Sequence, residues 1–400
     1  MSGATGGGRI APRGRTGVLT AICLFSFLVN FGRIAFAPLV DVFIEAGISP
    51  ATAGLAATAV WIGSALPRLP TGYLLTKVSR HRTILGMGVA LAAGATFTTL
   101  SQDIWWTITG ALFVGLATGV FFVAANPLLS ELYPENVGLA VGVRGMSSQI
   151  AAVVAPFLIA VAIALGSWRI AFGTLAVLAL VGTVVFALAV RRAELPTAGA
   201  RDRDLFGAIR AQWRLIVAGV LFVGLTGFAW QGVFNFYVTY LGAAKGIAPG
   251  TATTLLTLTF AAGVPAFLLA GRLADRVSYL ALLLAILGGF VGCLLALTMV
   301  EGVLAIAAVS IAMGAVIHGL FPVGDAYVLD SMPDEHRASA YSGFSAAMML
   351  IQAPGSVAVG VLAEGGLSYD GVFVGYAVLV GAIVVVMGGL AWAGRLPRGA

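Results

Sequence analysis

The chain has 400 residues, of which 60% are hydrophobic and 10% are charged. Soluble globular proteins carry about 25% charged residues, so this composition excludes a soluble enzyme, a nucleic-acid-binding protein and a secreted disulfide-rich domain. The formal net charge is +6, and Cys23 and Cys293 both lie in apolar stretches, which predicts buried thiols rather than a disulfide framework. The 53 glycines are typical of helices that pack closely in a lipid bilayer.

Apolar stretches of about 20 residues are long enough to cross a bilayer as helices. In this chain they predict twelve spanning helices, over residues 17–43, 51–75, 83–101, 104–130, 138–165, 169–190, 214–241, 251–273, 278–300, 302–330, 338–363 and 371–394. The expected domains are a disordered cytoplasmic N-terminus (1–16), an N-terminal six-helix bundle (17–190), a cytoplasmic linker (191–213), a C-terminal six-helix bundle (214–394) and a cytoplasmic tail (395–400).

Arginine and lysine are distributed unevenly over the predicted connections. If the N-terminus is cytoplasmic, nearly all of them lie on the cytoplasmic side, and the outside connections hold only Arg169 and Lys245. Cytoplasmic loops of membrane proteins carry an excess of positive charge. We therefore expect a multi-pass protein of the cell membrane with both termini in the cytoplasm. The topology accounts for the net charge, so no nucleic-acid partner is expected.

The two halves of the chain are related by an internal repeat. When the sequence is shifted by 199 residues, GISPATA at 47–53 falls on GIAPGTA at 246–252, and Glu131 falls on Asp330. A constant offset across most of a half indicates duplication, which is a hallmark of secondary transporters. The sequence therefore predicts an all-α membrane protein of two pseudo-symmetric six-helix bundles.

The connection between predicted helices 2 and 3 reads GYLLTKVSRHR over residues 72–82, and its repeat reads GRLADR over 271–276. Here the chain resembles the major facilitator superfamily, whose signature at this place is G-x-x-x-D-[RK]-x-G-R-[KR]. Thr76 and Ser79 replace the aspartate and the second glycine of that signature. The resemblance implies the major facilitator fold, a monomer without cofactor, and transport of a solute by alternating access.

The resemblance also implies a cytoplasmic gate. In the family, the loop between helices 8 and 9 packs against the start of helix 5, so Asp275 is expected near Arg144. Glu131 and Asp330 are repeat-related acids, which we expect to pair with basic residues such as Arg80 and Arg276. The expected gate residues are Lys77, Arg80, Glu131, Arg144, Asp275, Arg276 and Asp330.

Polar residues inside the predicted helices are few, and intramembrane polar groups mark functional sites by default. They are Asn30, Arg33, Arg68, Asn126, Arg144, Gln149, Gln231, Asn235, His318, Asp325 and Gln352. The interiors of helices 3, 6, 9 and 12 carry no charged residue, Asn, Gln or His. The superfamily fold implies that those four helices lie outside and that the other eight line a central cavity.

Arg33 and Arg68 are the most informative of these residues. Arginine is always charged, and its planar fork suits carboxylate, phosphate or nitrate-like groups. Arg68 lies in RLPTG, which resembles the R-x-P-x-G of nitrate/nitrite porters, but their second arginine corresponds here to Phe267. The alternative is a structural arginine that binds backbone carbonyls or pairs with Asp325. The candidate substrate-binding residues are Arg33, Arg68, Asn30, Gln231, Asn235, His318 and Gln352.

Asp325 and His318 are the candidates for proton coupling. They are seven residues apart, so they share one face of a helix. A carboxyl group in a low dielectric and a histidine can both exchange a proton near neutral pH. The alternatives are a fixed ion pair for Asp325 and a satisfied hydrogen bond for His318.

The leading interpretation is a secondary active transporter of a small anionic solute, with the proton as coupling ion and the lipid bilayer as its surroundings. Two alternatives stay open: an exporter of amphipathic or hydrophobic compounds, and a non-transporting membrane sensor with the same fold. A membrane enzyme is disfavoured, because three histidines, two of them in loops, supply no metal or acid–base cluster.

Overall fold

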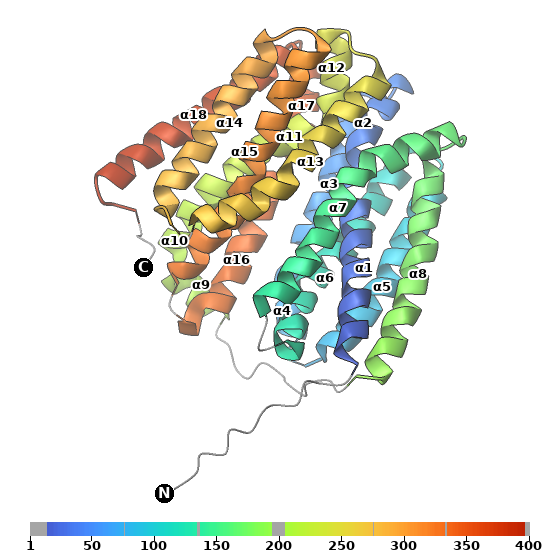
Figure 1. Cartoon of the computed structure of the whole chain (residues 1–400). Helices are drawn as coiled ribbons and strands as arrows, with labels where there is room; N and C mark the ends of the chain where they lie inside the picture. The colour runs from blue at the N-terminus through green and yellow to red at the C-terminus, as the bar shows by residue number, and fades with distance from the viewer. Residues whose placement is uncertain are drawn as a thin grey trace, which may run out of the picture.

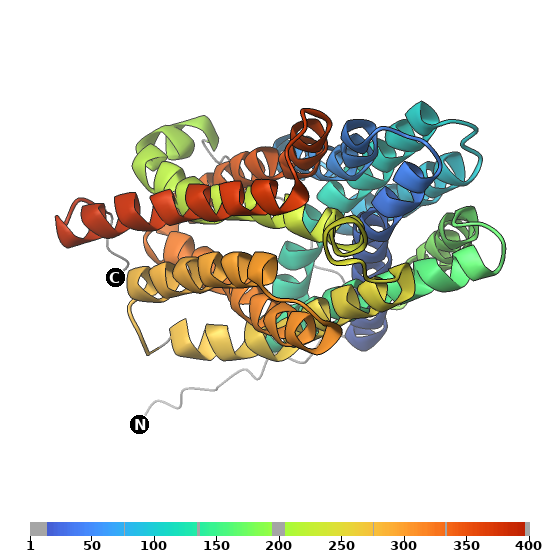
Figure 2. The ribbon, with the colours of Figure 1, turned by 90° about the horizontal axis from the view of Figure 1, so that it is seen from above.

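The computed structural model describes residues 14–75, 77–133, 137–193, 205–274, 276–332 and 334–396, and all regular structure in these ranges is helical. The expected disordered N-terminus and most of the expected linker and tail lie outside the described residues. The helices run roughly side by side in two groups, with the N-terminal half on the right of Figure 1 and the C-terminal half on the left. Figure 2 shows the same two groups from above.

The N-terminal half forms six membrane crossings, of which the first two are interrupted. Its helices are α1 (Arg15–Ile34), α2 (Phe36–Glu45), α3 (Pro50–Ala65), α4 (Arg68–Leu74), α5 (Arg80–Thr99), α6 (Ile104–Leu132), α7 (Val137–Ala164) and α8 (Arg169–Arg191). The crossing that contains α3 and α4 is interrupted just before Arg68, at Pro67. A proline ring clashes with the preceding helical turn and removes one hydrogen bond, which explains the break.

The C-terminal half repeats this pattern with more interruptions. Its helices are α9 (Leu205–Ala211), α10 (Trp213–Gly219), the π-helix η1 (Val220–Gly224), α11 (Leu225–Asn235), α12 (Tyr237–Lys245), α13 (Pro249–Ala274), α14 (Tyr279–Met299), α15 (Val303–Asp330), α16 (Asp334–Gln352), α17 (Gly355–Glu364) and α18 (Tyr369–Trp392). Pro354 separates α16 from α17. The short helix α9 lies within the expected linker and packs on α16, which the sequence analysis did not anticipate.

The predicted repeat is visible in the helix boundaries. α3 and α13 begin at Pro50 and Pro249, and α6 and α15 begin at Ile104 and Val303, so both pairs keep the offset seen in the sequence. The two pseudo-symmetric bundles predicted from the sequence are therefore confirmed.

Ten helices in the described part of the chain are long and apolar enough to span a membrane. The interrupted pair α3–α4 is not among them, and neither is α5, whose first turn is the polar Arg80, His81 and Arg82. α5, α8, α14 and α18 pack on helices of their own half and expose many apolar side chains, as Val184 on α8 and Val385 on α18 illustrate. These are the four helices predicted to lie outside.

The two halves approach closely at the end of the bundle that holds α2, α12 and α17, the upper end in Figure 1. A Cβ atom on Gly54 of α3 would lie 2.6 Å from the carbonyl oxygen of Ser356, and one on Gly360 of α17 would lie 2.3 Å from that of Pro50. The backbone N–H of Ala51 also donates to Glu364 Oε1 across the halves, at 2.8 Å. Only glycine permits backbones to come this close.

Candidate transport site

Arg33 lies in the last turn of α1 and is held by three neighbouring elements. Its Nη2 donates to Asn30 Oδ1 at 2.6 Å, and Asn30 Nδ2 donates to the carbonyl oxygen of Ser148 in α7 at 2.6 Å. The guanidinium carbon lies 4.2 Å from the centroid of the Trp61 ring and 5.3 Å from that of Phe122. Asn30 therefore positions Arg33, and two aromatic faces stabilise its charge.

Arg144 lies beside the same aromatic ring. Its guanidinium carbon is 5.3 Å from the centroid of Phe122. Its Nη1 lies 3.5 Å from Ser26 Oγ, and that hydroxyl donates to the backbone oxygen of Arg144 at 3.0 Å. Arg33 lies within electrostatic range of Arg144 and of Arg68. Arg144, which the family resemblance assigned to the gate, therefore shares the Phe122 ring with Arg33. Its expected partner, Asp275, lies outside the described residues.

Arg68 begins α4 and reaches into the C-terminal half. Its Nε donates to the carbonyl oxygen of Ser64 at 3.2 Å, and its Nη1 donates to Ser345 Oγ of α16. Asp325 of α15 accepts a hydrogen bond from the Tyr341 hydroxyl and lies within electrostatic range of Arg68. Arg68 and Asp325 therefore form one electrostatic unit across the interface between the halves.

We refer to Arg33, Arg68, Arg144 and Asp325 as the central cluster. All four side chains are half-buried within membrane-spanning segments. The three arginines belong to the N-terminal half and the carboxylate to the C-terminal half. The positions related to the arginines by the repeat hold Gly232, Phe267 and Gly343. The cluster thus contains three positively charged side chains and one acidic side chain. All three positive charges come from the N-terminal half.

Several buried polar atoms around the cluster have no hydrogen-bond partner among the residues that the structure describes. They are Arg33 Nε, Arg144 Nε, Trp61 Nε1 and Asn126 Oδ1. An unsatisfied polar group at membrane depth costs several kcal/mol. Three of the four atoms are N–H donors, so the surroundings of Phe122 are suited to a ligand that accepts hydrogen bonds.

The remaining candidate substrate residues lie in the C-terminal half and bond to one another or to backbone. Asn235 Nδ2 donates to the Gln231 carbonyl oxygen at 2.8 Å and to Ser356 Oγ at 2.8 Å. Gln352 Nε2 donates to the Val223 carbonyl oxygen of η1 at 3.2 Å. A π-helix disturbs the regular hydrogen-bond ladder, so this amide compensates a local irregularity.

His318 is packed among aromatic rings of its own half. Its ring centroid lies 5.7 Å from those of Trp230 and Phe260, and its Nδ1 lies 2.8 Å from the Gly314 carbonyl oxygen. The side chain is 4% exposed. These contacts are those of a satisfied core histidine, and the structure does not bring His318 to the arginines.

Among the predicted gate residues, Arg80 and Glu131 form an ion pair, with Nη1 2.6 Å from Oε1. Both belong to the N-terminal half, so the pair links α5 to α6. Lys77 Nζ lies 4.6 Å from the ring centroid of Tyr73, and Arg276 is exposed. Asp330 ends α15, but its side chain, like Asp275, lies outside the described part.

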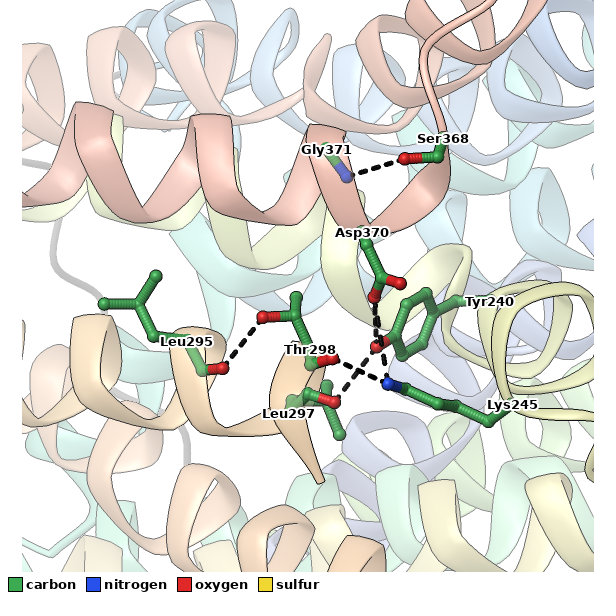
Figure 3. Close-up of polar contacts among 8 residues, drawn as sticks. All are labelled: Tyr240, Lys245, Leu295, Leu297, Thr298, Ser368, Asp370 and Gly371. Atoms are coloured by element: carbon green, nitrogen blue, oxygen red, sulfur yellow. Dashed lines mark hydrogen bonds and ion pairs between the residues drawn. The ribbon is translucent and has the colours of Figure 1, made fainter. Parts of the chain in front are cut away.

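The two basic residues predicted for the outside connections both bind carbonyl oxygens at helix ends. Lys245 Nζ donates to the Thr298 carbonyl oxygen at 2.7 Å and lies 4.0 Å from Asp370 Oδ1, beside Tyr240 (Figure 3). In the other half, Arg169 donates to the Ser101 carbonyl oxygen after α5 through Nε and Nη2, at 3.1 and 2.9 Å. Cations near helix C-termini are favoured by the helix dipole, so both residues have a structural role.

A comparison with protein families decides the identification. The family model described as Major Facilitator Superfamily matches residues 22–243 and 220–399. The chain belongs to the Major Facilitator Superfamily. The earlier resemblance is confirmed, and the ten long apolar helices are those of a multi-pass membrane protein.

The similar curated proteins are transporters of different solutes. The chain is 23% identical over 280 residues to a protein of Cupriavidus necator named probable sulfoacetate transporter SauU, covering 65% of each chain. It is also 29% and 30% identical to facilitated glucose transporter member 8 of solute carrier family 2 from Bos taurus and Mus musculus, over 33% and 32% of this chain. The matches span less than two thirds of the first relative and 29% and 28% of the other two.

Solved structures of the superfamily share the fold at low sequence identity. A bacterial homolog of the human lysosomal transporter Spinster, inward-facing and occupied, has a TM-score of 0.76 at 15% identity and covers 94% of this chain and 97% of its own. A POT family transporter in complex with a thioalcohol-conjugated peptide has a TM-score of 0.75 at 13% identity, covering 94% and 96%. These likenesses establish the fold alone.

Proposed function

We propose that this superfamily member is a proton-coupled transporter of a small organic anion in the cell membrane, with both termini in the cytoplasm and the monomer as the working unit. The observation that carries the proposal is the excess of half-buried arginine in the central cluster. A charge at membrane depth is costly unless it is paired. An anionic solute would supply the missing negative charge.

The binding groups are suited to an oxyanion. Arginine binds carboxylate, sulfonate-like and phosphate groups through parallel N–H donors. The unpartnered N–H donors of Arg33, Arg144 and Trp61 are available for such bonds. The relative named as a probable sulfoacetate transporter supports the same solute class, since sulfoacetate is a small organic anion.

Asp325 is the group that we assign to proton coupling. When it is ionised, its charge acts on Arg68, and the Tyr341 hydroxyl donates to it. Protonation of Asp325 would cancel that interaction and leave Arg68 free to attract an anion. A ligand that binds one of two states better shifts the population toward that state, so proton and solute uptake would be linked.

The test is uptake by proteoliposomes that contain the purified full-length protein. The solutes are sulfoacetate, short carboxylates, glucose and a lipophilic cation, each with and without an inward proton gradient. The proposal expects accumulation of at least one anion that depends on the gradient. Movement of only glucose or only the lipophilic cation would show that the solute class is wrong.

A further inference from the structure

The three arginines of the central cluster differ in how their charge is already compensated. Arg68 donates to Ser64 and Ser345 and lies within electrostatic range of Asp325. Among the described residues of the cluster, no second carboxylate faces Arg33 or Arg144. Their side-chain contacts are the neutral Asn30, Ser26, Trp61 and Phe122. Within the described part of the chain, these two positive charges have no carboxylate as a countercharge.

These two charges flank one aromatic ring. Both guanidinium carbons lie 5.3 Å from the centroid of Phe122, so they can be no farther apart than twice that distance. Each of the two arginines keeps one buried N–H, at Nε, that has no partner in the described ranges. Two guanidinium groups beside one ring can each bind one acid group, so together they suit two acid groups joined by a short carbon chain.

We propose that the transported solute is a dianion with two acid groups on a short spacer, one bound by Arg33 and the other by Arg144 beside Phe122. This inference rests on the proposed function and narrows it. Arg68 and Asp325 then couple transport to the proton. Arg33 and Arg144 select solutes by their charge. Arg144 is thus a specificity-determining residue as well as a member of the cluster.

The first experiment measures thermal stabilisation of the purified full-length protein by matched anions at constant ionic strength. The pairs are succinate against butyrate and malonate against propionate, with sulfoacetate as a further dianion. At least one dianion should bind about tenfold more tightly than the monoanions of equal carbon number, since a second charge-assisted contact is worth about that factor. Equal binding of both members of every pair, or no stabilisation by any dianion, would overturn the inference.

The second experiment locates the preference. Arg144→Gln should weaken dianion binding about tenfold more than it weakens monoanion binding. Arg33→Gln should act in the same way, so a folding defect in one variant leaves the other as a test. The matched control is Arg214→Gln, which removes an exposed arginine stacked on Trp213 and should change neither affinity.

The outcomes separate this inference from the proposed function. If Arg144→Gln weakens dianions and monoanions equally, Arg144 does not select charge and the dianion assignment is wrong. Uptake of monoanions alone in proteoliposomes would leave the proposed function standing and remove the inference. Failure of every anion to be transported would remove both.

Discussion

At the scale of single residues, the central cluster depends on the shape of arginine as well as its charge. Arg33 uses Nη2 on Asn30 and presents a flat face to Trp61 at 4.2 Å. Lysine keeps the charge but loses the planar fork and the stacking. The contacts of Arg33 therefore predict a strong effect of a conservative substitution.

We expect Arg33→Lys to raise the KM for dianion uptake about tenfold, which is the value of one lost charge-assisted hydrogen bond. The measurement is initial uptake into proteoliposomes over a range of solute concentrations. Arg214→Lys is the matched control, because that arginine is exposed and stacks on Trp213 outside the cluster. Wild-type kinetics in Arg33→Lys would show that the residue is only structural.

The proposed role of Asp325 predicts that one substitution can abolish coupling to the proton and leave transport of the solute intact. Asp325→Asn keeps the size and the hydrogen-bonding capacity of the side chain but cannot exchange a proton. Accumulation driven by a pH gradient should be lost, whereas exchange of solute down its own gradient should persist. Asp370→Asn at the outer contact with Tyr240 is the control. If Asp325→Asn still accumulates solute against its gradient, another group couples the proton.

The raised pKa of Glu131 predicts that the stability of the folded protein depends on pH. Burial raises its pKa above the usual value, and the neighbouring Arg80 offsets only part of this effect. An acid with a raised pKa in the folded state contributes most to stability below its unfolded pKa of about 4.5, and that contribution is lost as pH rises through the folded pKa.

The melting temperature of the wild type relative to Glu131→Gln should therefore rise as pH falls from 8 toward about 4.5. Thermal unfolding in detergent across this range measures the difference. Gln102→Ala, which alters an exposed neutral side chain between α5 and α6, should give a difference that does not change with pH. A Glu131→Gln difference that moves the other way with pH would contradict the raised pKa.

At the scale of elements, the tightest contact between the halves is that of α3 with α17. A Cβ on Gly360 would lie 2.3 Å from the Pro50 carbonyl oxygen, and backbone cannot move aside as a side chain can. Overpacking a close contact costs about 1–3 kcal/mol. In an alternating-access cycle the halves would separate here for the solute to enter from this end, so we expect the contact to affect transport.

We expect Gly360→Ala to lower the stability of the protein by about 1–3 kcal/mol and to slow uptake. Gly375→Ala is the matched control, because a Cβ at Gly375 of α18 meets no atom within 4 Å. Melting temperature and uptake rate of the two variants give the comparison. Equal behaviour of both alanine variants would mean that the α3–α17 contact does not limit the cycle.

Elements were the level at which the sequence predicted most. The stretch 302–330 corresponds to α15 over Val303–Asp330, because a long apolar run between polar breaks has few alternatives in a membrane. The break at Phe236, the π-helix η1 and the short α9 were not predicted. Such irregularities depend on contacts with other helices, as in the bond from Gln352 to Val223, and leave no periodic signal.

The candidate site was predicted in part. Arg33, Arg68 and Asp325 are visible as charges in apolar helices, and the structure brings them into one cluster. Arg144 is likewise a charge in an apolar helix, but the family resemblance led to its assignment to the gate rather than to the site. Trp61 and Phe122 gave no distinct signal, because aromatic residues are common in any membrane helix. Their role became visible only from the distances between rings and guanidinium groups.

At the scale of the whole molecule, the duplicated halves have diverged in charge. The repeat preserves helix starts such as Pro50 and Pro249, while the positions that hold the three arginines in one half hold two glycines and a phenylalanine in the other. The two bundles thus keep the same helix boundaries but differ in the charged side chains at related positions. Function in this fold follows from the site rather than from the architecture.

The one-sided placement of the arginines has a consequence for the path of the solute. A solute held by Arg33 and Arg144 would stay attached to the N-terminal half. We expect it to keep its orientation relative to that half throughout the cycle. We therefore expect the C-terminal half to move relative to the bound solute, so that Asp325 lies closer to Arg68 in one state than in the other. Distances from the bound solute to the N-terminal helices should stay constant between inward-open and outward-open states, while those to α15 and α16 change.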